Sequence, residues 1–258
     1  MKRFETVVRF DETSNNINDY IKETLLNNGY FYDEINSEII IVIGGDGTFL
    51  KAVHNNIDRL DEVSFYGIHT GTLGFFTDYK SDEVEEFVYD LINKKPILRE
   101  YQLLKVKVDN NDVYYALNEM RIENVVRTQV LNVTLNGEEF ETFRGTGMCV
   151  STQLGSTAYN RSLKGAVIQD GLPLIQMSEI AGIHHSAYRS LGVPIVMSED
   201  SKIVFESSCF EDAILCIDSC FYKLNGDHKK ISVELGEKKI KFLRFKNVSY
   251  FKKLQTLF

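Results

Sequence analysis

Five consecutive β-branched residues, Ile39 to Ile43, run directly into the sequence Gly44-Gly45-Asp46-Gly47-Thr48. Such a run predicts a strand that is buried on both faces of a parallel sheet, and the apolar spacing that begins at Phe49 predicts a helix immediately afterwards. Glycines allow the backbone to approach a ligand closely, and the free N–H groups at a helix start attract phosphate. We therefore predict an α/β fold with a phosphate-binding loop that carries one carboxylate, Asp46.

Two well-known phosphate-binding loops are excluded by this spacing. A Walker A loop needs a lysine followed by serine or threonine, and none follows here. The dinucleotide fingerprint G-x-G-x-x-G is excluded because Phe49 and Leu50 stand where its last glycine would fall. An ordinary capped strand-to-helix turn is the alternative. Phosphate-binding amides beside a single carboxylate favour the transfer of a phosphoryl group to a hydroxyl.

The first hundred residues alternate between strand and helix patterns. Strands are predicted at Thr6–Phe10, Ile39–Ile43 and Val63–Ile68. Helices are predicted from three sets of apolar residues with helical spacing: Ile17, Tyr20, Ile21 and Leu25; Phe49, Leu50, Val53 and Ile57; and Val84, Phe87, Val88, Leu91 and Ile92. Gly29 predicts the end of the first helix, and Asp82 with Glu85 is a capping pair at the start of the third. Repeated strand–helix units indicate a parallel sheet with helices on its faces.

The pattern changes near Pro96 to one dominated by strands. Asn136-Gly137 between alternating apolar residues predicts a hairpin with a two-residue turn. One helix is predicted, from Glu179 to Arg189. Strands are predicted at Leu103–Val108, Val113–Leu117, Leu131–Leu135, Ile203–Phe205, Ala213–Ile217, Ile231–Leu235 and Ile240–Phe245. The fold class is thus an α/β N-terminal domain with a parallel sheet (residues 1–98) plus a β-rich C-terminal domain (99–258), whose C-terminal end can pack back on the first domain.

Composition narrows the classes of partner. The net charge is −8 and no run of Lys or Arg forms a basic stripe, so nucleic acid is not expected to bind. The four cysteines, which form no C-x-x-C pair, are predicted to be reduced: Cys149, Cys209, Cys216 and Cys220. No apolar segment follows Met1-Lys2-Arg3, and no apolar run is long enough to span a bilayer. We therefore expect a cytoplasmic protein without a membrane partner.

Further polar segments follow the predicted strands. The loop His69 to Phe76 follows the Val63–Ile68 strand, and neighbouring parallel strands end at one sheet edge, so Thr70–Phe75 should lie beside Gly44–Thr48. A glycine-rich connector with two core phenylalanines is the alternative. The side chains of Asn118-Glu119, an amide and a carboxylate, can hydrogen-bond a purine edge and a ribose hydroxyl. The alternative is that they are two exposed polar residues at a strand end.

The segment Ser151 to Ser162 combines hydroxyl, amide and small side chains at the start of a predicted helix. It suits hydrogen bonding to a sugar or an amide, or alternatively is a capped helix in a long loop. Leu154-Gly155-Ser156-Thr157-Ala158 is not a G-x-S-x-G nucleophile elbow, which argues against acyl transfer. The adjacent His184 and His185 would point apart on a helix, so a surface role is favoured over metal binding.

Read in order, these segments resemble the NAD kinases of bacteria over nearly the whole chain. The Gly-Gly-Asp-Gly element alone is shared with diacylglycerol-type lipid kinases and loosely with phosphofructokinases, whereas the Asn-Glu and Gly-Ser-Thr-Ala-Tyr elements are more specific. The matching pieces are Gly44–Thr48, His69-Thr70-Gly71 with Leu73-Gly74-Phe75, Asn118-Glu119, Phe143-Arg144-Gly145, Ser151-Thr152 with Gly155–Tyr159, and Asp218.

The resemblance implies that the ATP γ-phosphoryl group passes to the 2′-hydroxyl of the adenosine ribose of NAD, giving NADP. It implies Mg²⁺ or another divalent cation bound to the substrate, no metal ligands in the chain, and Asp46 as the proton acceptor. The implied NAD-binding residues are Gly45, Gly47, Leu50, Phe75, Asn118, Glu119, Arg144, Thr146, Thr157, Ala158, Tyr159, Ser162 and Asp218. Self-association to a dimer or tetramer is also implied, with Ala181, Ile183 and Tyr188 of the predicted 179–189 helix completing the site of a neighbouring subunit.

Four positions depart from the family pattern. Thr146 stands where aspartate is common, Thr72 and Ser219 where histidine is common, and Gln153 where proline is frequent. Asp46 and Asn118-Glu119 are retained, so the changes bear on how tightly the nicotinamide side of NAD is held. They leave open a weakened or non-catalytic dinucleotide-binding relative. A lipid kinase of the same superfamily would lack Asn118-Glu119 and Gly155–Tyr159.

Overall fold

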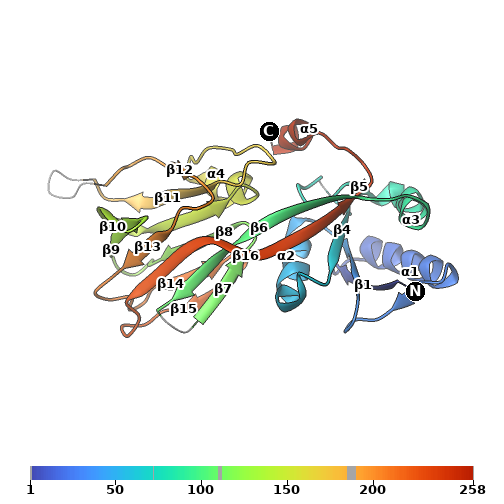
Figure 1. Ribbon diagram of the computed structural model, residues 1–258, viewed down its shortest axis with the longest axis horizontal. Helices are drawn as coiled ribbons and strands as arrows, with labels where there is room; N and C mark the ends of the chain where they lie inside the picture. Colours follow the sequence, from blue (N-terminus) through green and yellow to red (C-terminus); the bar gives the residue numbers. More distant parts are fainter. Residues whose placement is uncertain (1, 72, 110–111, 185–189, 258) are drawn as a thin grey trace. The chain divides into compact units, whose positions relative to one another are not determined.

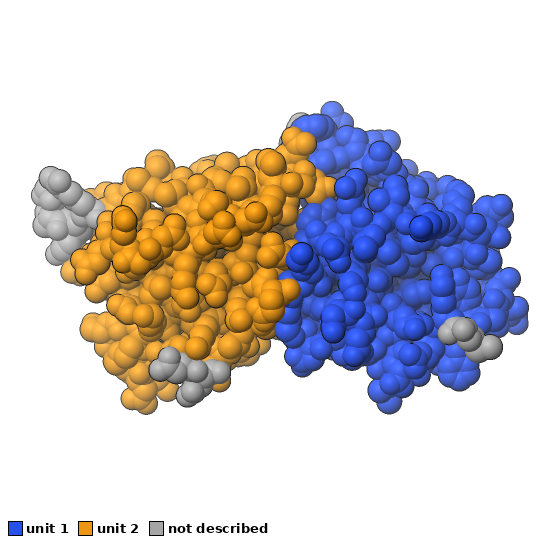
Figure 2. All heavy atoms as spheres, viewed as in Figure 1, with its two compact units in different colours: residues 1–101, 238–258 blue, residues 102–237 orange. Residues whose placement is uncertain are grey.

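The run from Ile39 to Ile43 forms strand β3, with all five residues buried. The structure is a computed structural model that describes residues 2–71, 73–109, 112–184 and 190–257 (Figure 1). The chain divides into two units, coloured separately in Figure 2. Unit 1 comprises Met1–Tyr101 and Lys238–Phe258, and unit 2 comprises Gln102–Glu237. The division thus falls at 101/102, and the C-terminal segment from residue 238 is counted with the first unit.

Unit 1 contains a parallel sheet in the order β16-β4-β3-β1-β2, with β5 beside the end of β4. The predicted parallel sheet is therefore confirmed, and the C-terminal part of β16 adds a strand to its edge. Its strands are β1 (Arg3–Val8), β2 (Phe31–Tyr32), β3 (Ile39–Ile43), β4 (Ser64–His69), β5 (Tyr79–Lys80) and part of β16 (Lys230–Arg244).

Helices follow the strands of unit 1 as the periodicity predicts. Asp11 caps the first helix by accepting from the Ser14 N–H, and Gly29 lies just beyond its end at φ 81°. One detail was wrong: the capping pair was predicted as Asp82 and Glu85, but the carboxylate before α3 that accepts a backbone N–H, from Lys80, belongs to Glu83. The helices are α1 (Glu12–Asn27), α2 (Asp46–Asn55), α3 (Val84–Asn93) and α5 (Tyr250–Leu254), with 3₁₀ turns η1 (Ile57–Arg59), η2 (Ser81–Glu83) and η4 (Gln255–Leu257).

The core of unit 1 fixes the start of α2. The Phe49 ring on this helix stacks on Phe242 of β16 at 5.0 Å and lies 5.3 Å from the Phe76 ring. Aromatic pairs of this kind add about 0.5–1.5 kcal/mol each beyond the burial of their area. A different cluster holds α1 and α3, through residues such as Ile21 and Phe87. The glycine loop before α2 is therefore attached to a rigid element.

Unit 2 is built from antiparallel strands, as expected for its β-rich sequence. Asn136 and Gly137 have φ angles of 52° and 89°, and Leu135 pairs with Glu138, so the predicted two-residue hairpin is confirmed. The strands are β6 (Ile97–Val108), β7 (Asp112–Ala116), β8 (Glu119–Glu123), β9 (Gln129–Leu135), β10 (Glu138–Thr152), β11 (Ile175–Gly182), β12 (Ile195–Met197), β13 (Ile203–Glu206), β14 (Ile214–Ile217), β15 (Cys220–Lys223) and β16, with β6 beginning and β16 ending in unit 1.

Two predictions in this unit were wrong. The predicted helix from Glu179 to Arg189 is instead strand β11 up to Gly182, paired with β10 along its length. Residues 185–189, including Tyr188, lie outside the described residues. The two strands predicted at Ile231–Leu235 and Ile240–Phe245 are one strand, β16, with Gly236 inside it. Unit 2 also has η3 (Gly155–Thr157) and α4 (Tyr159–Ser162) in the segment where a helix was predicted to start.

Among the described residues, no helix combines the length and the apolar character needed to cross a membrane.

Candidate active site

The glycine loop joins β3 to the first turn of α2. Gly44 leaves no room for a side chain, because a Cβ there would lie 2.4 Å from the Thr48 hydroxyl oxygen. A Cβ at Gly45 or Gly47 would meet no atom within 4 Å. The fold itself therefore does not require glycine at these two positions. Bare backbone beside open space is what a close approach by a ligand needs.

Asp46 is held by the loop that follows β4. The Phe75 N–H donates to its Oδ2 at 3.0 Å, and the Phe76 N–H donates to its Oδ1 at 3.1 Å. Gly74 makes this contact possible, since a Cβ there would lie 2.1 Å from Oδ1 of Asp46. The structure thus brings Gly74–Phe76 beside Asp46, as the parallel sheet predicts, and each carboxylate oxygen accepts a backbone N–H.

Further groups of unit 1 gather at the same sheet edge. Arg9 follows β1, with its N–H bonded to Ile43 and its Cβ 3.0 Å from where a Cβ of Gly44 would be. Its guanidinium pairs with Asp11 at 3.3 Å. Sequence reasoning missed this cation because the first strand was predicted at Thr6–Phe10, which includes Arg9, whereas β1 ends at Val8. Leu50 is buried with 9% exposed, so little of it can contact a ligand, and Thr72 lies outside the described residues.

In unit 2, Asp218 organises the Asn-Glu pair. Its buried carboxylate accepts the N–H groups of Leu117 at 2.8 Å, Asn118 at 2.8 Å and Glu119 at 3.1 Å. Its own N–H donates to the Glu119 carbonyl, and its φ of 51° lies in the left-handed region. Three charge-assisted bonds explain why an aspartate occupies this turn. The sequence places these residues about 100 positions apart, and the structure brings them together.

Two acceptor atoms of the Asn-Glu pair are buried without a hydrogen-bond partner: Oδ1 of Asn118 and Oε2 of Glu119. Leaving a buried acceptor unsatisfied costs about 1–3 kcal/mol, so such atoms are expected to meet a donor on a ligand. The backbone here is tightly packed, because a Cβ at Gly155 would lie 2.0 Å from the Asn118 carbonyl oxygen. The pair is thus a preorganised set of acceptors.

Burial, with the charge of Asp218, raises the pKa of Glu119 to about 7, while Arg121 and the Tyr159 N–H oppose the shift. Because the folded state then binds more protons than the unfolded state between about pH 4.5 and pH 7, the stability of the protein falls as the pH rises through that window. Glu119→Gln should remove this loss. We expect it to be more stable than the parent by up to about 3 kcal/mol above pH 7, and equal to it near pH 4.

Urea denaturation of both proteins from pH 4 to pH 8 tests this expectation. The matched control is Glu138→Gln, an exposed glutamate in the same unit. A difference between parent and Glu119→Gln that stays constant with pH would show that Glu119 ionises normally.

The segment after β10 supports the Asn-Glu pair from its other side. The Thr152 hydroxyl donates to the Leu117 carbonyl at 2.7 Å and accepts from the N–H groups of Leu154 and Gly155 at 3.1 Å each. The Arg121 guanidinium lies 4.1 Å from the centre of the Tyr159 ring. Thr157 and Ala158 are half-buried between these anchors, whereas Ser162 is exposed. The predicted Thr157–Tyr159 contact region is therefore beside Asn118 and Glu119.

The remaining predicted residues form a separate group. Ile183 N–H donates to the Arg144 carbonyl, and Gly145 pairs with Gly182. Ser151, which pairs with Glu119, is five positions along β10 from Thr146, about 17 Å at the rise of a strand. Arg144, Thr146, Ala181 and Ile183 therefore lie together, away from the Asn-Glu pair of the same chain. His184, nearby, is exposed and 3.7 Å from Glu179, and His185 lies outside the described residues.

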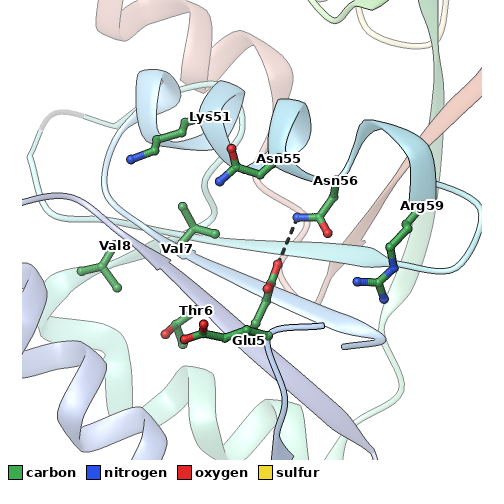
Figure 3. Close-up of a pocket in the computed structure, with 9 residues that line it drawn as sticks. Glu5, Thr6, Val7, Val8, Lys51, Asn55, Asn56 and Arg59 are labelled. Carbon is green, nitrogen blue, oxygen red and sulfur yellow. Dashed lines mark hydrogen bonds between the residues drawn. The ribbon is translucent and has the colours of Figure 1, made fainter. Parts of the chain in front are cut away.

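A polar cavity of about 450 Å³ lies over β1 in unit 1 (Figure 3). Its floor contains Glu5, which accepts from Nδ2 of Asn56 at 3.0 Å, and burial raises the pKa of this glutamate. Arg59 also lines it and donates to the Ser37 carbonyl at 2.7 Å. Because these groups bond one another or neighbouring backbone, they serve the fold of unit 1. No predicted site residue lines this cavity.

Within residues 2–71, 73–109, 112–184 and 190–257, no three His, Cys, Asp or Glu side chains are grouped to hold a metal ion. The donor set at the glycine loop is one carboxylate, Asp46, whose oxygens both accept backbone N–H groups. Such a set suits a cation that arrives on substrate phosphates better than one held by the protein alone.

Comparison with known proteins agrees with this geometry. The ATP-NAD kinase N-terminal domain model matches residues 6–96, and the ATP-NAD kinase C-terminal domain model matches residues 110–245. NAD kinase 1 of Bacillus cereus is 35% identical over 261 residues, covering 99% of this chain and 98% of that protein. NAD kinase 1 of Halalkalibacterium halodurans is 38% identical with the same coverage.

Solved structures share the fold. An NAD kinase from Archaeoglobus fulgidus in complex with ATP has a TM-score of 0.79 at 24% identity, covering 98% of this chain and 99% of that one. Yeast NADH kinase complexed with NADH has a TM-score of 0.80 at 17% identity, covering 99% of this chain and 86% of that one. With two family models across its length and relatives above 30% identity, the chain belongs to the ATP-NAD kinase family.

Proposed function

We propose that this protein transfers the γ-phosphoryl group of ATP to the 2′-hydroxyl of the adenosine ribose of NAD, giving NADP. The observation that carries the proposal is the fixed carboxylate of Asp46, held by the N–H groups of Phe75 and Phe76 next to a glycine loop with open backbone. Full-length relatives that are named NAD kinases support it. Two classes of alternative, a weakened dinucleotide-binding relative and a lipid kinase, have no comparable support.

Asp46 accepts the proton of the attacking ribose hydroxyl. Phosphoryl transfer needs little covalent help from a protein, so positioning and charge neutralisation supply most of the catalysis. A positioned general base adds about 10²–10⁴ in rate. Each oxygen of Asp46 uses one lone pair on a backbone N–H, which leaves a second lone pair for the substrate.

Asn118 and Glu119 hold the adenosine part of NAD. The unpartnered Oδ1 of Asn118 accepts from the exocyclic amine of adenine, and Oε2 of Glu119 accepts from a ribose hydroxyl. Asp218 fixes both residues through their backbone N–H groups, and Tyr159 lies beside them. A site whose buried acceptors stay unpaired without the correct ligand discriminates strongly against analogues that lack the donor.

The N–H groups of Gly45–Thr48 and the nearby Arg9 bind the ATP phosphates, and ATP brings Mg²⁺ or another divalent cation with it. When bound, this cation neutralises charge on the phosphate oxygens. The free cysteines among the described residues, Cys149, Cys209, Cys216 and Cys220, support a reducing compartment such as the cytoplasm.

Incubation of the purified protein with NAD, ATP and Mg²⁺ tests the proposal, with NADP measured by a dehydrogenase specific for it. We expect NADP to form and to require all three components. Binding of NAD without NADP, when ATP, other nucleoside triphosphates and polyphosphate have each been tried, would leave only a dinucleotide-binding protein. Phosphorylation of a diacylglycerol in place of NAD would indicate the lipid kinase.

We further propose that the protein works as a dimer or tetramer, in which the group formed by Arg144, Thr146, Ala181 and Ile183 contributes to the site of a neighbouring subunit. Ile183 is 47% exposed, and the following residues Leu191 and Val193 are also exposed apolar side chains. Ala181 has a φ of 45°, a strained value for alanine. Exposed apolar residues beside backbone strain support an interface that carries function.

Sedimentation of the protein at assay concentration tests the assembly. We expect a dimer or a larger species, and we expect Ile183→Glu to shift it toward the monomer while NADP formation falls. Val167→Glu, at another exposed apolar position of unit 2, is the matched control. A fully active monomer would contradict the proposal.

A further inference from the structure

The C-terminal segment of unit 1 packs on the loop that holds Asp46. This loop, residues 73–78, follows β4, and the segment comprises α5 and η4. The Tyr250 ring lies 5.9 Å from the Phe75 ring, and the Thr256 hydroxyl donates to the Leu73 carbonyl at 3.3 Å. Nothing in the sequence signals this role, because the segment is short and carries none of the family motifs.

Lys253 makes the central contact of this segment. It is a buried lysine with 2% exposed. Its Nζ donates to the Phe75 carbonyl at 3.0 Å, to the Thr77 carbonyl at 2.8 Å and to Oδ1 of Asp78 at 2.7 Å. An ammonium group has three donors, and all three are used. Burying a charge is costly unless it is paired and hydrogen-bonded, so this complete set of acceptors fixes the loop in one conformation.

Arg244 on β16 adds a second cation to the same loop. Its guanidinium donates to Oδ1 of Asp78 at 3.2 Å and to the Phe75 carbonyl at 3.4 Å. Two cations therefore share one buried carboxylate, which leaves excess positive charge behind the loop. Burial lowers the pKa of Lys253, and Arg244 lowers it too, while the charges of Asp78 and, to a smaller extent, Asp46 raise it.

A single peptide group connects Lys253 to Asp46. The Phe75 carbonyl, which accepts from Lys253, and the Phe76 N–H, which donates to Oδ1 of Asp46 at 3.1 Å, belong to the same peptide bond. Hydrogen bonds in such a chain polarise one another, which strengthens each of them. The ammonium thus orients this peptide and makes its N–H a better donor to the carboxylate.

We propose that Lys253, assisted by Arg244, is a positioning residue that holds Asp46 in its catalytic orientation through the Phe75–Phe76 peptide. The proposal rests on the proposed role of Asp46 as proton acceptor. Lys253 touches neither substrate, so its loss should lower kcat and leave the binding of NAD and ATP nearly unchanged. A misplacement of about 1 Å in a reacting group can lower a rate by about 10²-fold.

Lys253→Met tests this role, with Lys252→Met, an exposed lysine on the same helix, as the matched control. We expect kcat to fall by about 10-fold or more, with KM for NAD and ATP changed by less than about 3-fold. Hydrogen exchange should become faster at the amides of Phe75 and Phe76 and stay unchanged in β3. Lys253→Arg, which keeps charge and donors, should recover part of the rate.

A double-variant cycle separates positioning from a general loss of structure. In the Asp46→Asn background, Lys253→Met should cause little further loss of kcat, because its target is already gone. Independent losses that multiply, or uniformly faster exchange that includes β3, would overturn the proposal. If Lys253→Met does not fold, Lys253→Gln, which retains a donor, takes its place in every measurement. Absence of NADP formation by the parent protein would refute the proposed function, whereas the exchange at Phe75 and Phe76 would still report on the contact.

Discussion

Asp46→Asn is expected to lower kcat for NAD phosphorylation by about 10²-fold or more while NAD and ATP still bind. Asparagine keeps the size of the side chain and one acceptor oxygen, but it cannot take the proton of the ribose hydroxyl. It also presents an NH₂ group to one of the two backbone N–H groups, from Phe75 or Phe76, that bond the carboxylate. Both effects act on the transition state.

Steady-state kinetics and NAD titration together test this expectation. The pattern that fits is a large fall in kcat with nearly unchanged NAD affinity. Asp58→Asn is the control, since Asp58 is an exposed aspartate of the same unit. A kcat near that of the parent protein would assign the base to another group, and loss of NAD binding alone would make Asp46 a binding residue.

Asp218→Ala is expected to have the largest effect on stability. It leaves the buried N–H groups of Leu117, Asn118 and Glu119 without their acceptor. Each unsatisfied donor costs about 1–3 kcal/mol, and partial access of water reduces the sum, so a loss of about 3–5 kcal/mol in the free energy of unfolding is expected. Because the same bonds orient the Asn-Glu pair, KM for NAD should rise about 10-fold or more.

Urea denaturation and NAD kinetics measure the two effects. Asp218→Asn should be intermediate, because its one carbonyl oxygen can replace Oδ1, which accepts from Asn118 and Glu119. Asp227→Ala, at a more accessible position in unit 2, should behave like the parent. If Asp218→Ala is destabilised but its KM for NAD is unchanged, the expected role of Asp218 in NAD binding is contradicted and only its role in the fold of this turn remains.

Local patterns predicted the elements whose cause is local. The β-branched run at Ile39–Ile43 became β3 with the same ends, and Asn136-Gly137 became a two-residue turn because both residues adopt positive φ. The approach of Asp46 to the loop after β4 was also predictable, since both follow neighbouring parallel strands. In these cases one short segment, or a general rule for sheets, contains the necessary information.

Other features depend on distant residues and were wrong or missed. The stretch after Glu179 was interpreted as a helix, but pairing of β11 with β10, as at Ile180 with Gly147, decides its structure. Two strands were predicted, ending at Leu235 and beginning at Ile240, yet Gly236 lies inside the single strand β16, where a Cβ would be 2.9 Å from the Lys105 Cβ. Glycine at that position permits close packing between strands, which one sequence does not reveal. Lys253 carried no signal at all, because two of its acceptors are backbone carbonyls.

Unit 1 is formed by two separate segments of the chain, so it can be completed only late in synthesis. Asp46 emerges from the ribosome early, but Lys253 follows 207 residues later, after all of unit 2. At about 5–20 residues per second, the interval is on the order of 10–40 s. During this time the loop that holds Asp46 lacks its contacts with Lys253 and Arg244. Under the proposed role of Lys253, a nascent chain is therefore expected to reach its full rate of phosphoryl transfer only when the second segment has joined the first.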